Sequence, residues 1–282
     1  MALTQIQIDK FNNEGYLVIP DVFSKEELLL LRKEAEYIKH MVINSSLALN
    51  QKNPRLMWWM LPSGELYLFK IKPILDLSLT LYQIANESRI IDVMGILLGS
   101  KPVLIEDKIN YKQKLKSSKS DFQFEKFEVR QEEVYKHTDS AYFTKYGYPL
   151  NTITSAICLD DCIKENGTLE VWPGTHVQSI KSIDTERDGP VIEDKELKGY
   201  KNIFLEAKAG SMLIWHANLV HCSHENSLSS NRRLIIMGHT SEGQMINEYY
   251  SRNNVLRFHS SPLEWEYTRL KDIGGYIDRK LL

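Results

Sequence analysis

The sequence predicts a mainly β protein with helices (α+β), in which an antiparallel β-sandwich or jelly roll carries helices at its N-terminal end. Two observations predict this fold class. Helical periodicity and helix-capping signals fill the first third of the chain, whereas short β-type segments separated by glycine and proline turns follow residue 102. The sequence has no internal repeat and no linker-like stretch, so we expect a single domain over residues 1–282.

Two helices are predicted in the first third of the chain. The first follows a capping box at Ser24–Glu27 and places apolar side chains at helical spacing. The second begins at Asn86 and ends at Gly99, because glycine readily adopts the left-handed conformation that closes a helix. Between the two helices, the aromatic segments 57–60 and 67–69 are expected to pack in the core or, alternatively, to form one wall of a substrate pocket.

Short strands are predicted beyond residue 102, where β-branched and aromatic residues are frequent. They lie at Val103–Ile105, Ile109–Tyr111, Thr152–Leu159, Thr168–Trp172, Ser211–Trp215 and Arg232–Gly238. The charged stretch 112–131 interrupts this pattern and is predicted to be a loop. Because long loops inside a domain are often functional, and because this one directly precedes His137, we expect a mobile lid over residues 112–131.

The composition argues against several kinds of partner. The 282 residues carry a net charge of −2, so no basic field favours nucleic acid or an anionic membrane surface. No apolar run approaches the length of a membrane span, and the first residues lack the apolar core of a signal peptide. The three cysteines form no C-x-x-C pair, which indicates free thiols in a reducing compartment. We therefore expect a soluble cytoplasmic protein.

The segment His137-Thr138-Asp139 is the strongest candidate for chemistry. Residues two apart on an extended strand point to the same face, so His137 and Asp139 are predicted to face one metal ion together. Two histidines and one carboxylate on one face of an octahedron form the facial triad of non-haem Fe(II) oxygenases. The pair therefore requires a second histidine from elsewhere in the chain. Without one, it is only a hydrogen-bonded pair.

The second histidine must come from the eight in the chain. The candidates are His216, His221 and His224, which lie within one short segment. His221 and His224 are three residues apart and would point to opposite faces of a strand, so they cannot both join one site without a bend. Spacing and composition do not choose among the three.

Several segments of the chain occur in an order that resembles one known family. They are Phe11–Pro20, the serine-capped helix, the second helix ending at Leu98-Gly99, His137-Thr138-Asp139, Glu165–His176, Ala209-Gly210, His216, His221, Asn226 and Arg232. From about Phe11 to Ile236, the chain thus resembles the phytanoyl-CoA dioxygenase (PhyH) family of Fe(II)- and 2-oxoglutarate-dependent oxygenases. The resemblance implies a double-stranded β-helix core, which is a cupin-like jelly roll.

The resemblance also implies roles for individual residues. His221 would be the distal ligand and would complete, with His137 and Asp139, a site for Fe(II). Arg232 would bind the far carboxylate of the co-substrate 2-oxoglutarate, since a guanidinium can hold a carboxylate through two hydrogen bonds and stays charged when buried. Its neighbour Arg233 is then expected to face the other way along the strand.

Other positions match the family or depart from it. His176 and His216 resemble positions that are usually structural, so neither is expected to bind the metal. Thr138 stands where many members have glutamine. His224 adds an imidazole that the family pattern does not require, which leaves open a metal site that differs from the family's.

The resemblance implies a reaction that consumes O2 and 2-oxoglutarate and releases succinate and CO2. We expect hydroxylation, or desaturation or cyclisation, of an unactivated C–H bond in a small-molecule or carrier-bound substrate of specialised metabolism. Asp139 argues against halogenation, because related halogenases replace this carboxylate with a small residue. The lysine-rich stretch 112–126 is a candidate for contacting an anionic group such as a phosphopantetheine or CoA.

Two alternatives belong to other functional classes. A non-catalytic jelly-roll binding protein would be expected to have lost one of the four residues His137, Asp139, His221 and Arg232, yet all four are present. A cupin metalloenzyme of another reaction type would not need Arg232 at its spacing. The substrate and the oligomeric state do not follow from the sequence.

Overall fold

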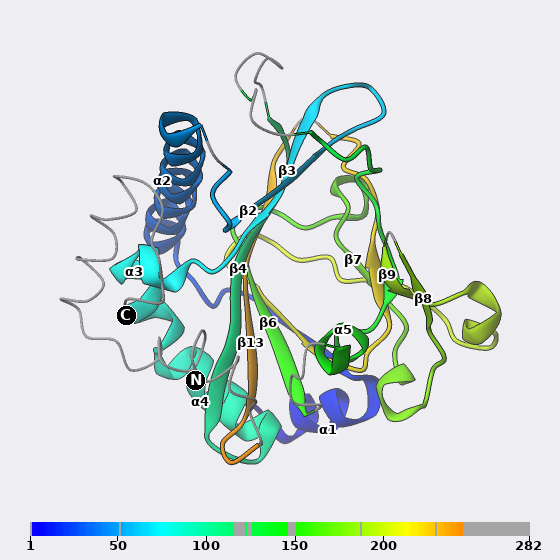
Figure 1. Cartoon of the computed structure of the whole chain (residues 1–282). Helices are drawn as coiled ribbons and strands as arrows, with labels where there is room; N and C mark the ends of the chain where they lie inside the picture. The colour runs from blue at the N-terminus through cyan, green and yellow to red at the C-terminus, as the bar shows by residue number, and fades with distance from the viewer. Residues whose placement is uncertain are drawn as a thin grey trace.

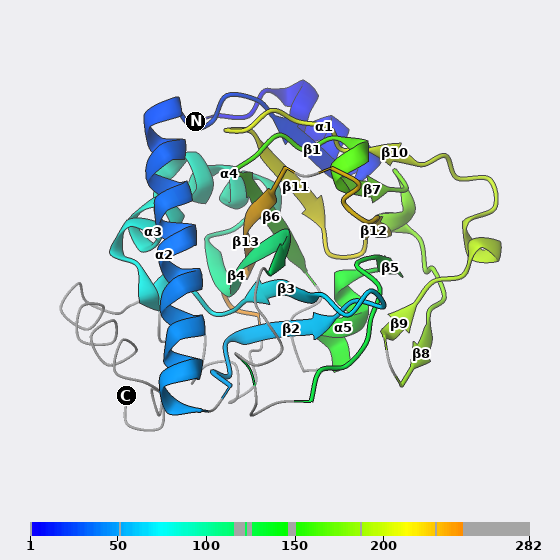
Figure 2. The same cartoon turned by 90° about the horizontal axis from the view of Figure 1, so that it is seen from above.

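Two antiparallel sheets lie opposite each other in the computed structural model, and helices cover the outer face of the larger sheet (Figure 1). The structure describes residues 2–50, 52–115, 122, 126–145, 151–186, 188–228 and 230–244. Seen from above, α2 (Lys25–Leu49), α3 (Leu79–Ala85) and α4 (Ser88–Leu98) lie on one side of the larger sheet, and the smaller sheet lies on the other (Figure 2). The space between the two sheets is therefore separated from the helical layer by the larger sheet.

The larger sheet has the strand order β1-β11-β6-β13-β4-β3-β2 in the described part of the chain, and its neighbouring strands are antiparallel. In that order the strands are Tyr16–Ile19, Met212–His216, Thr152–Cys158, Arg232–Ser241, Pro102–Leu115, Leu66–Ile71 and Leu56–Met60. Segments from both ends of the chain thus pair in one sheet, which a local sequence pattern cannot predict.

Strand β4 is longer than the sequence predicted. It continues to Leu115 and pairs with β13 and β3, so the prediction that a loop begins at residue 112 is wrong for residues 112–115. Lys112 pairs with β13 and residues 113–115 pair with β3, and this backbone pairing outweighs their charged composition. Most of the rest of the predicted lid, residues 116–121 and 123–125, lies outside the described residues.

The smaller sheet has the order β10-β7-β12-β5, and β8 pairs with β9 in a separate hairpin. These strands are Ile203–Phe204, Leu169–Val171, His221–Ser223, Val134–His137, Ile183–Thr185 and Gly189–Val191. From β4 onward the chain alternates between the sheets, because β4, β6, β11 and β13 belong to the larger one and β5, β7 and β12 to the smaller. The exception is β10, which follows β7 and the β8–β9 hairpin and also belongs to the smaller sheet. This connectivity is the predicted double-stranded β-helix.

The helices gather mainly at the N-terminal end of the sequence, as predicted. They are α1 (Gln5–Glu14), α2 (Lys25–Leu49), α3 (Leu79–Ala85), α4 (Ser88–Leu98) and α5 (Asp139–Lys145), with short 3-10 turns at Leu75–Leu77, Lys164–Asn166, Thr175–Val177 and Asp194–Leu197. The predicted capping box of α2 is present. The Glu27 amide donates to Ser24 Oγ at 3.2 Å, and the Ser24 amide donates to Glu27 Oε2 at 2.7 Å.

The start of the second predicted helix needs correction. Helix α4 begins at Ser88, and Asn86 instead follows the end of α3, where its Nδ2 donates to the Tyr82 carbonyl at 2.8 Å. A side-chain amide can cap either end of a helix, so the residue type alone did not distinguish the two. The end of α4 is as predicted, since Gly99 adopts a left-handed φ of 66°.

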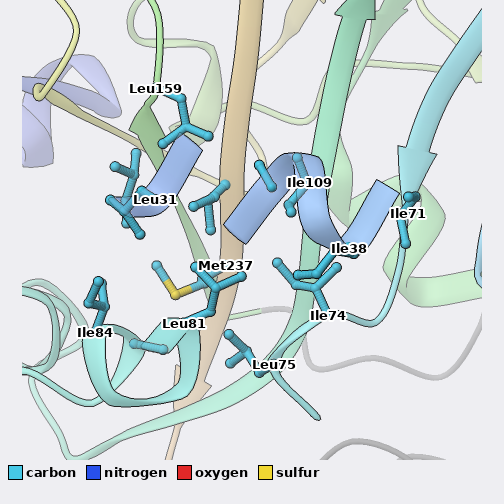
Figure 3. Close-up of a cluster of buried hydrophobic side chains, with 14 of the residues drawn as sticks. Leu31, Ile38, Ile71, Ile74, Leu75, Leu81, Ile84, Ile109, Leu159 and Met237 are labelled. Carbon is cyan, nitrogen blue, oxygen red and sulfur yellow. The ribbon is translucent and has the colours of Figure 1, made fainter. Parts of the chain in front are cut away.

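An apolar layer fills the space between α2 and the larger sheet (Figure 3). Leu31 and Ile38 of α2 are fully buried against residues such as Ile109 of β4 and Met237 of β13. Burial of such a side chain contributes about 2 kcal/mol. Because strand side chains alternate, these contacts turn Lys112 and Arg232 towards the space between the two sheets.

Two further expectations concern membrane-spanning helices and the cysteines. The described helices include none with the length and apolar character needed to cross a membrane. All three cysteines, Cys158, Cys162 and Cys222, are buried free thiols, as predicted.

Candidate metal centre and co-substrate pocket

Three side chains converge where the smaller sheet meets α5. His137 ends β5, Asp139 begins α5, and His221 begins β12. The two histidines are cross-strand partners with ring centroids 4.2 Å apart. Asp139 Oδ1 lies 3.9 Å from His137 Nε2 and 3.7 Å from His221 Nε2. Two imidazole nitrogens and one carboxylate oxygen therefore surround one point.

The path of the chain between His137 and Asp139 differs from the prediction. The strand ends at His137, and the helix that follows begins at Asp139, so the two residues do not lie on one strand. The change from strand to helix at Thr138, rather than strand alternation, brings their side chains together. The predicted juxtaposition of His137 and Asp139 is observed, but its geometric reason was wrong.

Backbone carbonyls fix the orientation of both imidazoles. His137 Nδ1 lies 2.7 Å from the Tyr135 carbonyl, and His221 Nδ1 lies 2.9 Å from the Leu219 carbonyl. Each Nδ1 therefore carries the proton and donates it to the carbonyl, which leaves the Nε2 lone pair directed at the common point. This is the tautomer that a metal ligand needs.

Asp139 is held through its other oxygen. Oδ2 accepts hydrogen bonds from Thr154 Oγ1 at 3.1 Å and from Trp215 Nε1 at 2.9 Å. Thr154 and Trp215 are cross-strand partners on β6 and β11. Sequence reasoning placed both on strands but missed this role, because it depends on the register between two strands that are distant in the sequence.

The protonation state of the cluster also suits a cation. Burial, together with the neighbouring His221, lowers the pKa of His137 to about 3. Burial alone would raise the pKa of Asp139, but His221, Lys108 and His137 outweigh it and lower that pKa below its ordinary value. A neutral imidazole and an ionised carboxylate are the forms that bind metal.

The donor set fits Fe(II). Among the described residues, His137, Asp139 and His221 place their ligand atoms within 4.8 Å of one another, and two histidines with one carboxylate leave three octahedral positions for co-substrate and oxygen. Since Nδ1 of each histidine is already bonded to a carbonyl, only the nitrogens that face the common point remain as ligands. The three sequence-predicted ligand candidates thus lie together.

Two buried cations lie beside this cluster. Arg232 of β13 and Lys112 of β4 are cross-strand partners, each 3% exposed. Arg232 Nη2 donates to the Gly167 carbonyl at 2.9 Å, and its Nε lacks a hydrogen-bond partner among the residues that the structure describes. Lys112 Nζ donates to Ser223 Oγ at 3.2 Å. In the described part of the chain neither cation forms an ion pair, although the buried Glu132 carboxyl lies near Lys112. One carboxylate cannot balance two buried cations, so a further anion would be favoured beside them.

The charge of Lys112 depends strongly on this setting. Burial, and then the nearby Arg232, lower its pKa to about 7, although Glu132, Cys222 and Glu133 act in the opposite direction. Asn110 Oδ1 is also buried without a hydrogen-bond partner among the described residues. Asn110 precedes Lys112 by two positions and so shares its face of β4.

The spacing between the cations and the metal cluster suits a short dicarboxylate. Ser223, which Lys112 contacts, lies two residues from His221 on β12, and two residues along a strand span about 7 Å. A five-carbon dicarboxylate has this reach between its two ends. Sequence reasoning identified Arg232 for this pocket. It assigned Lys112 to a loop that contacts an anionic group of the substrate, and it did not single out Ser223.

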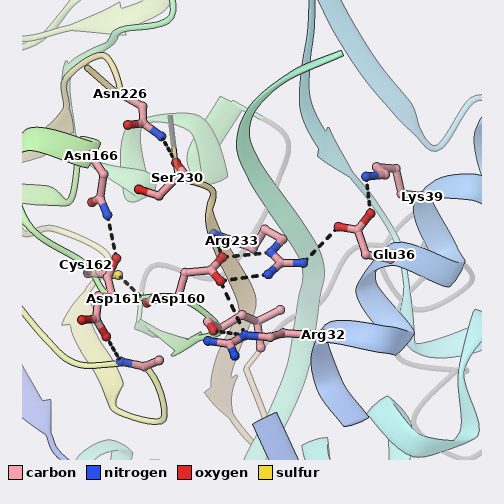
Figure 4. Close-up of polar contacts among 12 residues, drawn as sticks. Arg32, Glu36, Lys39, Asp160, Asp161, Cys162, Asn166, Asn226, Ser230 and Arg233 are labelled. Atoms are coloured by element: carbon pink, nitrogen blue, oxygen red, sulfur yellow. Dashed lines mark hydrogen bonds and ion pairs between the residues drawn. The ribbon is translucent and has the colours of Figure 1, made fainter. Parts of the chain in front are cut away.

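Arg233 faces the other way along β13, as predicted (Figure 4). Its guanidinium donates to both oxygens of Asp160, at 2.9 and 2.8 Å, and to Glu36 of α2 at 3.0 Å. Adjacent arginines therefore have separate tasks: Arg233 joins the sheet to the helical layer, and Arg232 points between the sheets.

Three other histidines among the described residues, His176, His216 and His224, lie outside the triad. His176 Nε2 bonds to the Asn12 carbonyl at 3.2 Å, and His216 Nδ1 accepts from the Asn218 amide at 3.0 Å, in keeping with structural roles. His224 lies close to Glu170, with 2.5 Å between His224 Nε2 and Glu170 Oε2. It is therefore not a fourth member of the His137 cluster.

A double-stranded β-helix with two histidines and a carboxylate between its sheets defines the class of non-haem metal oxygenases. The model of the Phytanoyl-CoA dioxygenase (PhyH) family matches residues 11–234, and the chain belongs to this family. The predicted enzyme class, a 2-oxoglutarate-dependent dioxygenase, and its cofactors Fe(II), 2-oxoglutarate and O2 are thereby confirmed.

Individual proteins show the same relationship at low identity. A "Phytanoyl-CoA dioxygenase" of Arabidopsis thaliana is 26% identical over 82% of this chain and 86% of its own length. A "Methylphosphonate hydroxylase" of Gimesia maris is 24% identical over 89% of this chain and 86% of its own. The crystal structure of EctD from S. alaskensis with bound Fe has a TM-score of 0.66 at 19% identity, covering 87% of this chain and 79% of that one. At that identity the structural likeness supports the fold alone.

Proposed function

We propose that this enzyme hydroxylates, or alternatively desaturates or cyclises, an unactivated C–H bond of an acidic small-molecule or carrier-bound substrate. His137, Asp139 and His221 hold Fe(II), and Arg232 holds the far carboxylate of 2-oxoglutarate. One observation carries this proposal. The three convergent donor atoms lie beside two buried cations, and these cations form no ion pair in the described part of the chain.

The protein's own residues bind and orient the reactants. When bound, iron with 2-oxoglutarate and O2 supplies the oxidising power, and the co-substrate leaves as succinate and CO2. Arg232 offers its Nε, which no described residue contacts through a hydrogen bond, to the far carboxylate, and Lys112 offers a second positive charge beside it. Asp139 keeps one oxygen for the metal because Thr154 and Trp215 hold the other. A carboxylate at this position disfavours halogenation, since it fills the coordination position that a halide would take.

Aromatic residues of β2 and β3 support an apolar wall for the substrate. Trp58 packs into the core beside the helices, whereas Trp59, the next residue, packs with Tyr67 and Phe69 on the opposite face. This alternation places Trp58 in the core and supports Trp59 as part of a substrate wall, the two roles that the sequence left open. Tyr142 adds an aromatic edge 5.3 Å from the His137 ring.

The same face of β3 and β4 carries excess positive charge. Lys108 and Lys72 both pair with Glu106, at 2.7 and 3.1 Å. Lys70 forms no ion pair with any described residue, and burial, together with Lys108 and Lys72, lowers its pKa well below the ordinary value. A substrate carboxylate or phosphate near Lys70 would restore its charge and neutralise the excess. Two relatives carry names with an anionic substrate, phytanoyl-CoA and methylphosphonate.

Anaerobic absorbance spectroscopy tests the core of this proposal. Addition of Fe(II) and then 2-oxoglutarate to the full chain should produce a visible metal-to-ligand charge-transfer band. Asp139→Ala should lose the band, and Arg232→Leu should require at least about tenfold more 2-oxoglutarate to reach it. Folded protein without a band would favour a non-catalytic binding protein or another cupin metalloenzyme.

A substrate screen scored by succinate release tests the acidic substrate. Acids that stimulate succinate release should lose this effect when converted to neutral esters. Lys70→Gln should raise KM for the acid at least about tenfold and leave KM for 2-oxoglutarate unchanged. Equal stimulation by an acid and its ester would contradict the proposed charge recognition, while leaving the oxygenase chemistry intact.

A further inference from the structure

A second cluster of metal-binding side chains lies on the other face of β12. His221 and Ser223 point between the sheets, so the alternate residue Cys222 and the following His224 point outwards. Cys222 has Glu170 of β7 as its cross-strand partner. The ligand atoms of Glu170, Cys222 and His224 lie within 4.8 Å of one another. The cluster uses none of the residues of the iron site.

The spacing of the three ligand atoms is close to that of a tetrahedral site. Glu170 Oε2 lies 3.2 Å from Cys222 Sγ and 2.5 Å from His224 Nε2, and Sγ lies 3.9 Å from Nε2. Zinc bonds of about 2.3 Å to sulfur and about 2.0 Å to nitrogen or oxygen give ligand separations of about 3.3 to 3.6 Å. His224 and Glu170 need to separate by about 0.8 Å, which a small side-chain rotation of the half-exposed His224 provides.

Neighbouring residues orient two of the three ligands. Asn202 Nδ2 donates to Glu170 Oε1, which leaves Glu170 Oε2 for the cluster. Glu133 Oε1 lies 3.7 Å from His224 Nδ1, so the outer nitrogen of this imidazole faces a carboxylate while Nε2 faces inwards. A carboxylate behind a histidine ligand is a common arrangement in zinc sites, where it fixes the tautomer and strengthens the ligand.

The cluster is buried at Cys222 and half-exposed at His224. Cys222 is 2% exposed, whereas the His224 side chain is 44% exposed. The sulfur is thus protected from oxidants, and the side towards His224 is open to an ion and to a water molecule in the fourth position. Two nearby carboxylates, Glu170 and Glu133, provide negative charge for a divalent cation.

We propose that Glu170, Cys222 and His224 form a second metal site that binds a zinc-class divalent cation with a thiolate ligand. On binding, the ion replaces the proton of the Cys222 thiol, which leaves to solvent, and no electron transfer takes place. The site joins β7 to β12 on the outer face, behind His221. The inference does not depend on the proposed function. The competing interpretation is a cluster held by hydrogen bonds alone.

Cobalt(II) spectroscopy of the full chain distinguishes the two. Thiolate coordination gives an intense near-ultraviolet sulfur-to-cobalt band, which the sulfur-free iron site cannot produce. We expect this band in the wild type and in Asp139→Ala, which disrupts the iron site, with one equivalent of Co(II) bound in the variant. Zn(II) should bleach the band by displacing cobalt.

Matched variants identify the ligands. Cys222→Ser should remove the band, and His224→Asn, a change at a half-exposed side chain, should weaken cobalt binding at least about tenfold. Cys162→Ser is the control at another buried cysteine and should leave the band unchanged. No band in Asp139→Ala, or a band that persists in Cys222→Ser, would overturn the proposal. Circular dichroism verifies that each variant is folded. If Cys222→Ser does not fold, the cobalt affinity of His224→Asn tests the proposal instead, and an affinity equal to that of the wild type would overturn it.

Discussion

At the scale of single residues, the two oxygens of Asp139 have different surroundings. Thr154 and Trp215 donate to Oδ2, so the carboxylate is held in place and Oδ1 faces the two imidazoles. His137 and His221 are held in the same manner by backbone carbonyls. Ligands that are positioned before the metal arrives lose little conformational freedom on binding it.

Trp215→Phe tests this positioning. The substitution keeps an aromatic ring in the core and removes the Nε1 donor to Asp139. We expect Fe(II) affinity to fall about tenfold, while the free energy of unfolding changes by only about 1 kcal/mol. Titration of Fe(II) in the presence of 2-oxoglutarate measures the affinity through the charge-transfer band. Trp58→Phe, on the helical side of the larger sheet, is the control and should leave the affinity unchanged.

Lys112 should make 2-oxoglutarate binding depend on pH. Its pKa is lowered to about 7 by burial and Arg232, so the side chain is charged below pH 7 and loses its proton above it. A bound carboxylate favours the charged form and raises this pKa, so binding above pH 7 takes up a proton. The affinity for 2-oxoglutarate should therefore fall by up to tenfold per pH unit above pH 7.

Isothermal titration at pH 6 to 9 measures this dependence directly. Lys112→Arg keeps a permanent charge and should flatten the pH profile, whereas Lys112→Met should weaken binding most at pH 6. Identical profiles for the wild type and Lys112→Arg would show that another group is responsible.

At the scale of elements, a short turn delivers a carbonyl to Arg232. The 3-10 turn Lys164–Asn166 ends in Gly167, whose φ of 71° is left-handed and whose carbonyl accepts from Arg232 Nη2. A Cβ on Gly167 would lie 2.2 Å from the His224 carbonyl oxygen and 2.6 Å from Lys112 Nζ. Only glycine permits this approach of the turn to β12 and β4.

Gly167→Ala should damage the co-substrate pocket more than the metal site. We expect the affinity for 2-oxoglutarate to fall at least about tenfold and the protein to lose about 1–3 kcal/mol of stability, because the turn must shift away from Arg232. Gly64→Ala is the matched control, since Gly64 has a similar φ of 84° with nothing within 4 Å of its Cβ position. Gly64→Ala should lower the stability through backbone strain alone and leave the affinity for 2-oxoglutarate unchanged. Thermal unfolding and 2-oxoglutarate titration separate the two effects.

At the scale of the whole molecule, several histidines are buried and neutral. Burial, together with His176, lowers the pKa of His216 to about 4, and burial lowers that of His239 to about 3. Neither nitrogen of His239 has a hydrogen-bond partner among the described residues. The unfolded chain, in which histidine has a pKa near 6.5, therefore binds more protons than the folded one between about pH 6.5 and pH 4.

The protein should lose stability on acidification through this window. Each of these two histidines contributes a loss of about 1.4 kcal/mol per pH unit as the pH falls below 6.5, until its folded pKa is reached. Urea unfolding at pH 7, 6 and 5 measures the slope. His239→Leu should reduce it, and His40→Gln, at an exposed side chain, should not. An unchanged slope in His239→Leu would contradict the assignment.

The sequence by itself determined much that depends on local pattern. The capping box of α2, the end of α4 at Gly99 and the opposite directions of Arg232 and Arg233 follow from residues that are neighbours in the chain. His137 and Asp139 were singled out by their spacing, whereas His221 and Arg232 followed only from the resemblance to the PhyH family. Helix α1 carries a further capping box at Thr4–Gln7 that sequence reasoning did not single out. The caps and the strand directions are local features, because they require only the geometry of one helix or one strand.

The tertiary structure alone decided which distant residues meet. Lys112 became a partner of Arg232 because β4 pairs with β13, and Trp215 became a partner of Asp139 because β11 lies beside β6. In the same way, the pairing of β12 with β7 brought Cys222 next to Glu170. Register between strands is set by the packing of the whole sheet against its core, and one residue of slip would turn each of these side chains to the opposite face.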